Sequence, residues 1–231
     1  MNTSTKTHTH TISPVSLEHF LEAIRNFRTR FYEDEPEMMQ ALLDYGQHPS
    51  ALIIACSDSR VDPALLVNAA PGDLFVVRNV ANLVPPYDVS EMHQSIGAAI
   101  EYAVRDLQVG HIIVMGHAHC GGIKALINTV SGQKPERDFI GNWVSIAEEA
   151  CSLYVNHESG QKKMSLQQLK DYTYLVERAA VEISLRNLLS YPWLKIAVDE
   201  GKLKLHGWWF DLETGDLWAT TAETNTFMPV D

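Results

Sequence analysis

The sequence predicts an α/β fold built on a central, mostly parallel sheet. Two short apolar runs, at 51–55 and 111–117, are typical of strands buried on both faces. Stretches with helical periodicity alternate with these runs, and such alternation favours parallel pairing. The chain has 231 residues, of which 45% are apolar and 20% charged, so it is long enough for one large domain or two small ones.

The expected helices follow from apolar residues spaced three or four positions apart. Residues 16–44 predict two helices broken near Pro36. The segment 62–70 predicts a short helix with Pro63 in its first turn. Further helices are expected at 90–107, 121–130, 136–158 and 165–190.

Two further regions predict strands. LFVV at 74–77 follows a Pro-Gly-Asp turn and reads as a third β-rich run. The segment 202–221 predicts a strand, a Thr-Gly turn and a second strand.

Charge and hydropathy narrow the classes of partner. The net charge is −11 and the pI is about 5.3, so the chain repels phosphate backbones and no nucleic-acid partner is expected. No apolar run approaches the ~18 residues of a membrane span, so no membrane partner is expected. Residues 1–14 lack the apolar core of a signal peptide and are expected to form a disordered tail. We therefore expect a cytoplasmic protein, with an organelle or microcompartment left open.

Three cysteines at wide spacing form no disulfide framework, so their thiols are available for chemistry. Cys56 and the HAHCGG motif at 117–122 each follow a buried strand, at the sheet edge where open α/β folds place their ligand sites. Cys56, His117 and Cys120 offer the ligands that zinc prefers, and three protein ligands leave the open position of a catalytic site. Each motif alone is explained as well by an inert thiol or by chance. Their pairing at two strand ends favours a metal. Cys151 has no partner spacing and is assigned to packing.

Asp58 and Arg60 follow Cys56 closely. An arginine beside a carboxylate keeps it ionised and fixes its direction, which makes the carboxylate a pure hydrogen-bond acceptor. The alternative is that Asp58 or Ser57 caps the next helix, but capping leaves Arg60 unexplained.

These motifs together resemble the β-class carbonic anhydrases. The resemblance continues through 71–87, 97–104, 116–126, 184–194 and 207–211. Gln47, nine residues before Cys56, matches a pocket glutamine of the plant-type, open-site branch. The resemblance implies four parallel strands plus an antiparallel edge strand, flanked by helices, in a single domain over 15–231. It also implies an N-terminal helical arm at 15–45 that embraces a partner subunit.

The resemblance assigns a role to each matched residue. Cys56, His117 and Cys120 would hold one Zn²⁺ per chain, and Asp58 and Arg60 would be the catalytic pair. Substrate-pocket positions would be Gln47, Phe75, Val80, Tyr102 and Gly121, with Gln47 and Phe75 offered across a dimer interface. The implied activity is reversible hydration of carbon dioxide to bicarbonate and a proton by zinc-bound hydroxide, in a homodimer, a homotetramer or a higher even oligomer.

Several alternatives stay open. The same zinc site can hydrolyse CS2 or carbonyl sulfide, as some family members do, and a non-catalytic zinc-binding protein can share the fold. His119 reads as a solvent-facing spacer, with proton shuttle as the second interpretation. Some members bind regulatory bicarbonate beside a tryptophan three residues before the first cysteine ligand. Ile53 stands there and has no indole N–H, so the open-site form is expected, with Asp58 paired to Arg60.

Overall fold

The computed structural model describes residues 15–90, 94–133, 136–155, 164–220 and 226–230. The tail predicted for residues 1–14 lies outside these ranges. The chain divides into two compact units, 1–47 and 48–231, and each is described by itself. Within the described ranges, no helix combines the length and apolar character needed to cross a bilayer.

The N-terminal unit is helical. Helix α1 (Leu17–Arg28) begins at Ser16, whose hydroxyl accepts a hydrogen bond from the backbone N–H of His19. A π-helical segment (Thr29–Asp34) follows, and the predicted break falls at Glu35. Helix α2 (Pro36–Tyr45) starts on the proline because proline has no N–H to leave unpaired in a first turn.

The apolar side chains of α1 are largely uncovered. Five of them are between 42% and 74% exposed: Leu17, Phe20, Leu21, Ile24 and Phe27. Phe31, whose ring centroid lies 4.6 Å from that of Phe27, is the one buried residue of the π-helical segment. The two helices therefore leave an apolar face that they do not bury themselves.

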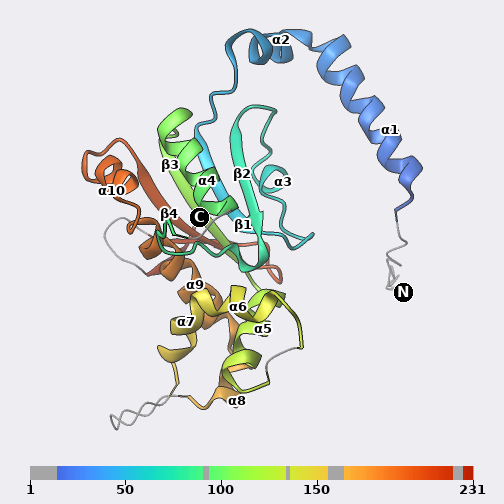
Figure 1. Ribbon diagram of the computed structural model, residues 1–231. Coiled ribbons are helices and arrows are strands. Elements are labelled where there is room, and N and C mark those ends of the chain that lie inside the picture. The colour runs from blue at the N-terminus through green and yellow to red at the C-terminus, as the bar shows by residue number, and fades with distance from the viewer. Residues whose placement is uncertain (1–14, 91–93, 134–135, 156–163, 221–225, 231) are drawn as a thin grey trace, which may run out of the picture. The chain divides into compact units, whose positions relative to one another are not determined.

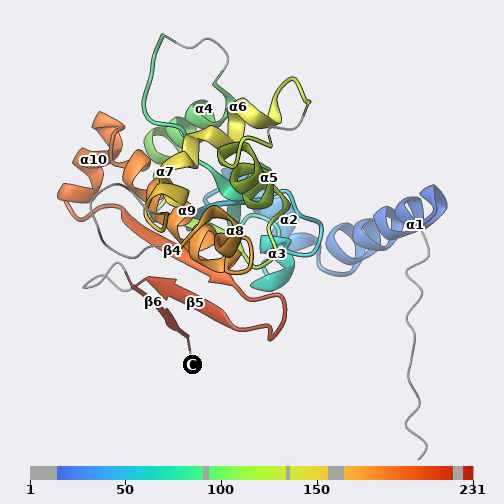
Figure 2. The same cartoon turned by 90° about the horizontal axis from the view of Figure 1, so that it is seen from below.

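The second unit is built on a six-stranded sheet in the order β2-β1-β3-β4-β5-β6, of which Figure 1 labels β1 to β4. The first four strands pair in parallel and the last two are antiparallel, so the predicted α/β class is confirmed. The strands are β1 (Ala51–Cys56), β2 (Leu74–Asn79), β3 (His111–His117), β4 (Lys204–Phe210), β5 (Leu217–Thr220) and β6 (Phe227–Pro229). The sequence did not predict β6, because three residues are too few to show a period. Figure 2 shows β5 and β6 beyond β4, with the C-terminus beside β6.

Alternate residues of β1 and β3 enter different apolar clusters, as the two-residue period of a strand requires. Leu52 and Ile54 belong to a cluster with Ile112 and Val114. Ile53 and Ala55 belong to another cluster, which also holds Ile113 and Met115. Every residue of β1 is buried, which explains its continuous apolar run.

One helix of this unit spans its predicted range, 121–130, whereas the other predicted helices are shorter or divided. The helices are α3 (Pro63–Leu66), α4 (Ser95–Glu101), α5 (Gly121–Val130), α6 (Ile140–Val144), α7 (Glu148–Ser152), α8 (Leu166–Leu169), α9 (Thr173–Leu188) and α10 (Pro192–Asp199). Helix α3 ends early, and Asn68 just beyond it has a φ of +50°. The predicted helix at 136–158 is instead α6 and α7 joined by a 3-10 turn (Ser145–Ala147), and its end lies outside the described residues. Helix α10 was not predicted.

Candidate metal centre

Three predicted ligands meet at one edge of the sheet. Cys56 ends β1, His117 ends β3, and Cys120 directly precedes α5. Because β1 and β3 are parallel neighbours, their carboxyl ends lie side by side. All three residues are buried, and their ligand atoms lie within 4.8 Å of one another.

The spacing of these atoms fits a tetrahedral metal. Two thiolates bound at about 2.3 Å to a tetrahedral zinc lie about 3.8 Å apart, and the Sγ atoms of Cys56 and Cys120 are 3.9 Å apart. A nitrogen and two sulfurs are also the donor set that zinc selects over Mg²⁺ or Ca²⁺.

His117 presents its Nε2 atom to the metal position. Its Nδ1 lies 2.8 Å from the carbonyl oxygen of Ala118, so Nδ1 carries the proton and donates it to that oxygen. The Nε2 lone pair is then free, and this buried atom has no hydrogen-bond partner among the described residues. A buried nitrogen without a partner is costly, and a metal ion removes that cost.

The two thiols are not equivalent. The hydrogen bond between them lowers the pKa of Cys56 and raises that of Cys120, because one sulfur takes the negative charge first and the other keeps the proton. The backbone N–H of Ala81 lies 3.4 Å from the Cys56 sulfur and supports its charge. A divalent cation replaces the remaining proton and neutralises both thiolates.

Asp58 and Arg60 form the ion pair that the sequence predicted. The Nε and backbone N–H of Arg60 donate to Oδ1 of Asp58 at 2.9 and 3.0 Å, and Nη2 donates to Oδ2 at 2.7 Å. The Arg60 guanidinium therefore holds the pKa of Asp58 far below its usual range. Oδ2 of Asp58 lies 3.9 Å from Nε2 of His117, so the carboxylate faces the metal position.

Arg78, on β2, holds the loop that carries Asp58, and the sequence analysis did not find it. Its guanidinium donates to the carbonyl oxygens of Cys56 and Asp58 and to the carboxylate of Asp62. The available signal was an arginine directly after the apolar run 74–77. Such a residue needs buried acceptors.

A second carboxylate, Glu177 on α9, lies behind the ligands and was also missed. It is 2% exposed. Its Oε1 accepts the backbone N–H of Cys120 at 3.2 Å, and its Oε2 accepts the indole N–H of Trp209 at 3.1 Å. Burial raises the pKa of Glu177.

The predicted pocket residues fall into separate groups. Phe75 and Tyr102 have ring centroids 5.9 Å apart. Val80 packs near Gly122, since a Cβ on Gly122 would lie 2.7 Å from Cγ1 of Val80. A Cβ on Gly121 would meet no atom within 4 Å. Gln47 belongs to the N-terminal unit, so its place beside the site stays a prediction.

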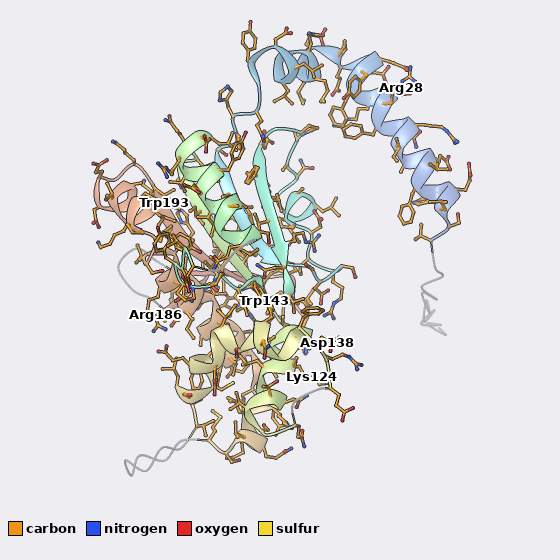
Figure 3. The ribbon with its side chains drawn as sticks, in the orientation of Figure 1. Arg28, Lys124, Asp138, Trp143, Arg186 and Trp193 are labelled. Atoms are coloured by element: carbon orange, nitrogen blue, oxygen red, sulfur yellow. The ribbon has the colours of Figure 1, made fainter. Side chains whose placement is uncertain are left out.

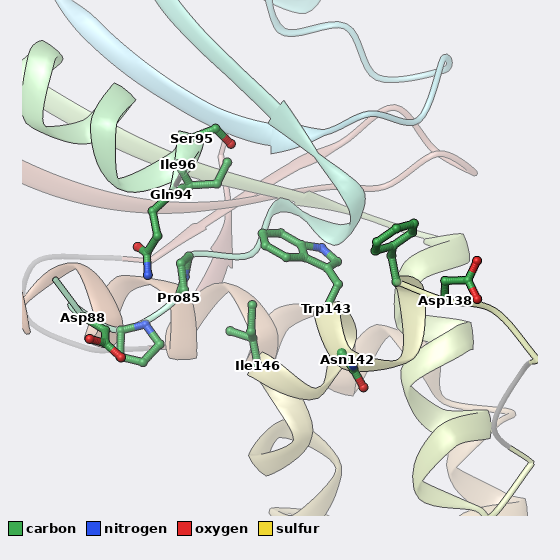
Figure 4. A pocket seen from close by; sticks show the side chains of 11 residues that line it. Pro85, Asp88, Gln94, Ser95, Ile96, Asp138, Asn142, Trp143 and Ile146 are labelled. Carbon is green, nitrogen blue, oxygen red and sulfur yellow. The ribbon is translucent and has the colours of Figure 1, made fainter. Parts of the chain in front are cut away.

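Trp143 connects Val80 to a neighbouring hollow. Its indole N–H donates to the Val80 carbonyl oxygen at 2.7 Å, and Figure 3 shows the side chain at the end of the sheet. The hollow has a volume of about 500 Å³. In the view of Figure 4, Trp143 lies between Pro85 and Asp138. None of the three ligands lines this hollow. The hollow is therefore separate from the metal triad.

The side chain of His119 lies at the protein surface. It is 55% exposed, and its Nε2 lies 2.7 Å from a carboxylate oxygen of Glu213. The residue has a φ of +57°, a left-handed conformation that costs on the order of 1 kcal/mol for a residue with a Cβ. The turn between His117 and Cys120 is thus held in a strained form.

An open parallel sheet with two thiolates and one imidazole at its carboxyl edge defines a zinc-dependent catalyst. The family profile described as carbonic anhydrase matches residues 51–217. Beta carbonic anhydrase 3 of Arabidopsis thaliana is 37% identical over 217 residues, which cover 90% of this chain and 79% of the relative. A carbonic anhydrase of Synechococcus elongatus is 33% identical, covering 85% and 69%.

The solved structure of the β-carbonic anhydrase CcaA is similar with a TM-score of 0.79 and 32% identity, covering 93% of this chain and 92% of that chain. The chain therefore belongs to the β class of the carbonic anhydrase family. The Cys-His-Cys triad is the one expected of its zinc site.

Proposed function

We propose that the chain catalyses reversible hydration of carbon dioxide to bicarbonate and a proton, with Asp58 and Arg60 as its catalytic pair. The observation that carries this proposal is the position of the Asp58 carboxylate. Both of its oxygens accept hydrogen bonds from Arg60, and it faces the ligand atoms. Zinc held by Cys56, His117 and Cys120 would supply a Lewis acid that makes water nucleophilic near neutral pH.

The residues around the metal position orient the reacting molecule and bind the substrate. Ionised Asp58 only accepts hydrogen bonds, so its Oδ2 selects a reacting molecule that still carries a proton. Arg60 keeps that carboxylate ionised and aimed. Phe75, Val80 and Tyr102 supply apolar surface for carbon dioxide, and Val80 and Tyr102 are 38% and 45% exposed in the single chain. Gly121 offers a backbone N–H beside Cys120 for a bicarbonate oxygen.

A zinc determination combined with stopped-flow assays of carbon dioxide, CS2 and carbonyl sulfide on one preparation tests the substrate. We expect one zinc per chain and turnover of carbon dioxide far above that of either sulfur compound. Preferential turnover of a sulfur compound would assign the sulfur-hydrolase activity instead. A zinc-loaded protein without any turnover would make the site non-catalytic.

We also infer a homodimer or a higher even oligomer. The exposed apolar face of α1 supports it, because so much exposed apolar surface is normally covered by a partner. A solved pair of β-carbonic anhydrases from Sordaria macrospora, 26% identical with a TM-score of 0.71 over 87% of this chain and 95% of that one, is described as tetrameric. Gln47 would then enter a neighbour's site. A fully active monomer in sedimentation and kinetics at nanomolar concentration contradicts this.

The pairing of Asp58 supports the open-site form. Both carboxylate oxygens accept from Arg60, and Ile53 has no side-chain N–H for a regulatory bicarbonate site. We expect activity to fall at low pH without cooperative bicarbonate inhibition. A crystal structure near pH 7 with an Asp58 oxygen about 2.0–2.2 Å from zinc would overturn this assignment.

A further inference from the structure

One peptide group joins the two carboxylates of the site. The carbonyl oxygen of His119 accepts a hydrogen bond from Nη2 of Arg60 at 3.3 Å. The N–H at the other end of that peptide, on Cys120, donates to Oε1 of Glu177 at 3.2 Å. The His119–Cys120 peptide is therefore held from opposite sides, by an exposed arginine and by a buried carboxylate.

This peptide needs such support. It follows a residue with a left-handed φ of +57°, which relaxes unless the surroundings fix it. It also leads directly into the zinc ligand Cys120, so a rotation of the peptide moves the ligand sulfur. The same rotation turns the His119 carbonyl away from Arg60.

Glu177 is itself fixed. Its second oxygen accepts the indole N–H of Trp209 on β4, and Trp209 is 3% exposed. The guanidinium of Arg178 lies 4.2 Å from the Trp209 ring centroid and 4.3 Å from that of Trp218. This cation–π contact also holds the Trp209 indole in place. Each carboxylate oxygen thus accepts one N–H from a different element, and the Thr173 side chain, on the same helix as Glu177, adds a further hydrogen bond to the carboxylate.

We propose that Glu177 is a positioning residue of the metal centre, which holds the His119–Cys120 peptide and through it both the Cys120 ligand and Arg60. A carboxylate is required because two N–H donors approach it. A glutamine has the same shape but only one acceptor atom, so one of its N–H groups would face an N–H donor. The effect on Cys120 does not depend on the proposed roles of Asp58 and Arg60.

The test measures zinc release from the full-length holoprotein to a chelator in three variants. We expect Glu177→Gln to release zinc at least ~10-fold faster than wild type, in the range found for groups that orient metal ligands. Trp209→Phe, which leaves Glu177 bound to Cys120, should change the rate less than ~3-fold. The double variant E177Q/W209F should release zinc more slowly than E177Q, since the amide oxygen can then serve Cys120 alone.

Co²⁺-substituted protein supplies a readout that simple loss of packing would not move. We expect E177Q to shift the cobalt d–d bands, which follow ligand geometry, and E177Q/W209F to shift them back. Glu182→Gln is the matched control, because Glu182 is on the same helix but lines another pocket with Glu149 and Arg186. It should leave both readouts at their wild-type values.

A wild-type release rate and spectrum in E177Q would overturn the proposal, as would a double variant no slower than E177Q. If E177Q is not recovered folded, E177Q/W209F is compared with W209F, and equal rates overturn it. Failure of the catalytic pair is detected separately. In that case Asp58→Asn hydrates carbon dioxide normally, while the zinc-release rates still decide the role of Glu177.

Discussion

The metal centre has an exposed side and a buried side, and each side has one carboxylate. On the exposed side Asp58 pairs with Arg60, and on the buried side Glu177 accepts the backbone N–H of Cys120. On the exposed side, the side chains of Asp58 and Arg60 are 17% and 52% accessible, whereas Glu177 on the buried side is 2% exposed. The guanidinium lowers the pKa of Asp58, and burial raises that of Glu177. The same functional group therefore serves two purposes: one carboxylate faces the reacting molecules, and the other is occupied by protein N–H donors.

Removing a metal ligand should have the largest effect, because the exposed and the buried side of the centre both depend on the bound metal. Cys120→Ser replaces a soft thiolate in a three-ligand site, so zinc content after dialysis and carbon dioxide hydration should both fall to near background. Cys151→Ser is the control, because the Cys151 thiol is buried and its pKa is raised to about 12. It should keep full zinc. The opposite pattern of zinc loss would move the metal site to Cys151.

Substitutions on the exposed side should lower the rate of hydration more than they lower zinc binding. Asp58→Asn puts an amide donor where an acceptor faces the ligands, and Arg60→Ala removes the group that orients Asp58. We expect hydration to fall about 10²–10⁴-fold in each, with circular dichroism unchanged in both variants and zinc content unchanged in Asp58→Asn. Wild-type turnover by either zinc-loaded variant would remove the pair from the mechanism.

A change between the two sides should cost stability. A Cβ on Gly122 would lie 2.7 Å from Cγ1 of Val80 and 2.8 Å from Cβ of Ala81. Gly122→Ala should therefore lower the free energy of unfolding by about 1–3 kcal/mol through overpacking. Gly121→Ala is the matched control, since its Cβ would meet no atom within 4 Å and the backbone N–H remains. Equal urea midpoints for the two variants would contradict the expected clash.

The smallest effect concerns acid stability of the metal-free protein. Because the pKa of Asp58 is lower in the folded state, its ionised form stabilises the fold above the unfolded pKa of about 3.9. That contribution is lost as the pH falls further. The difference in unfolding free energy between wild type and Asp58→Asn should be constant at pH 6–8 and shrink below about pH 4. A difference that grows in acid would refute the assigned direction.

The features of this centre that depend on local sequence pattern could be predicted from the sequence. Continuous apolar runs marked β1 and β3, and ligand-type residues at their ends marked the metal triad. The spacing of Asp58 and Arg60 also sufficed, because an aspartate and an arginine two residues apart contact each other through their own loop.

Groups brought together by tertiary structure were not predictable. Glu177 lies 57 residues after Cys120, on a helix where a glutamate usually faces solvent. Only the packing of α9 against β3 and β4 turns it inward. Arg78 is similar, since its acceptors are backbone carbonyls and a carboxylate 16 residues earlier, which the sequence pattern around Arg78 does not reveal. Periodicity also overstated helix length at 136–158, where α6 and α7 are separated by a 3-10 turn.

The order of these groups along the chain has a consequence for how the enzyme acquires its metal. Both cysteine ligands and the histidine precede α5, but the carboxylate that fixes Cys120 comes from α9 and its indole partner from β4. A refolding chain that has paired only β1 with β3 thus brings Cys56 and His117 together, while Cys120 follows on a turn that Glu177 does not yet hold. From the proposed role of Glu177, we expect tight metal retention only after β4, the last parallel strand, has docked, so that metal uptake during refolding records how far the sheet has assembled.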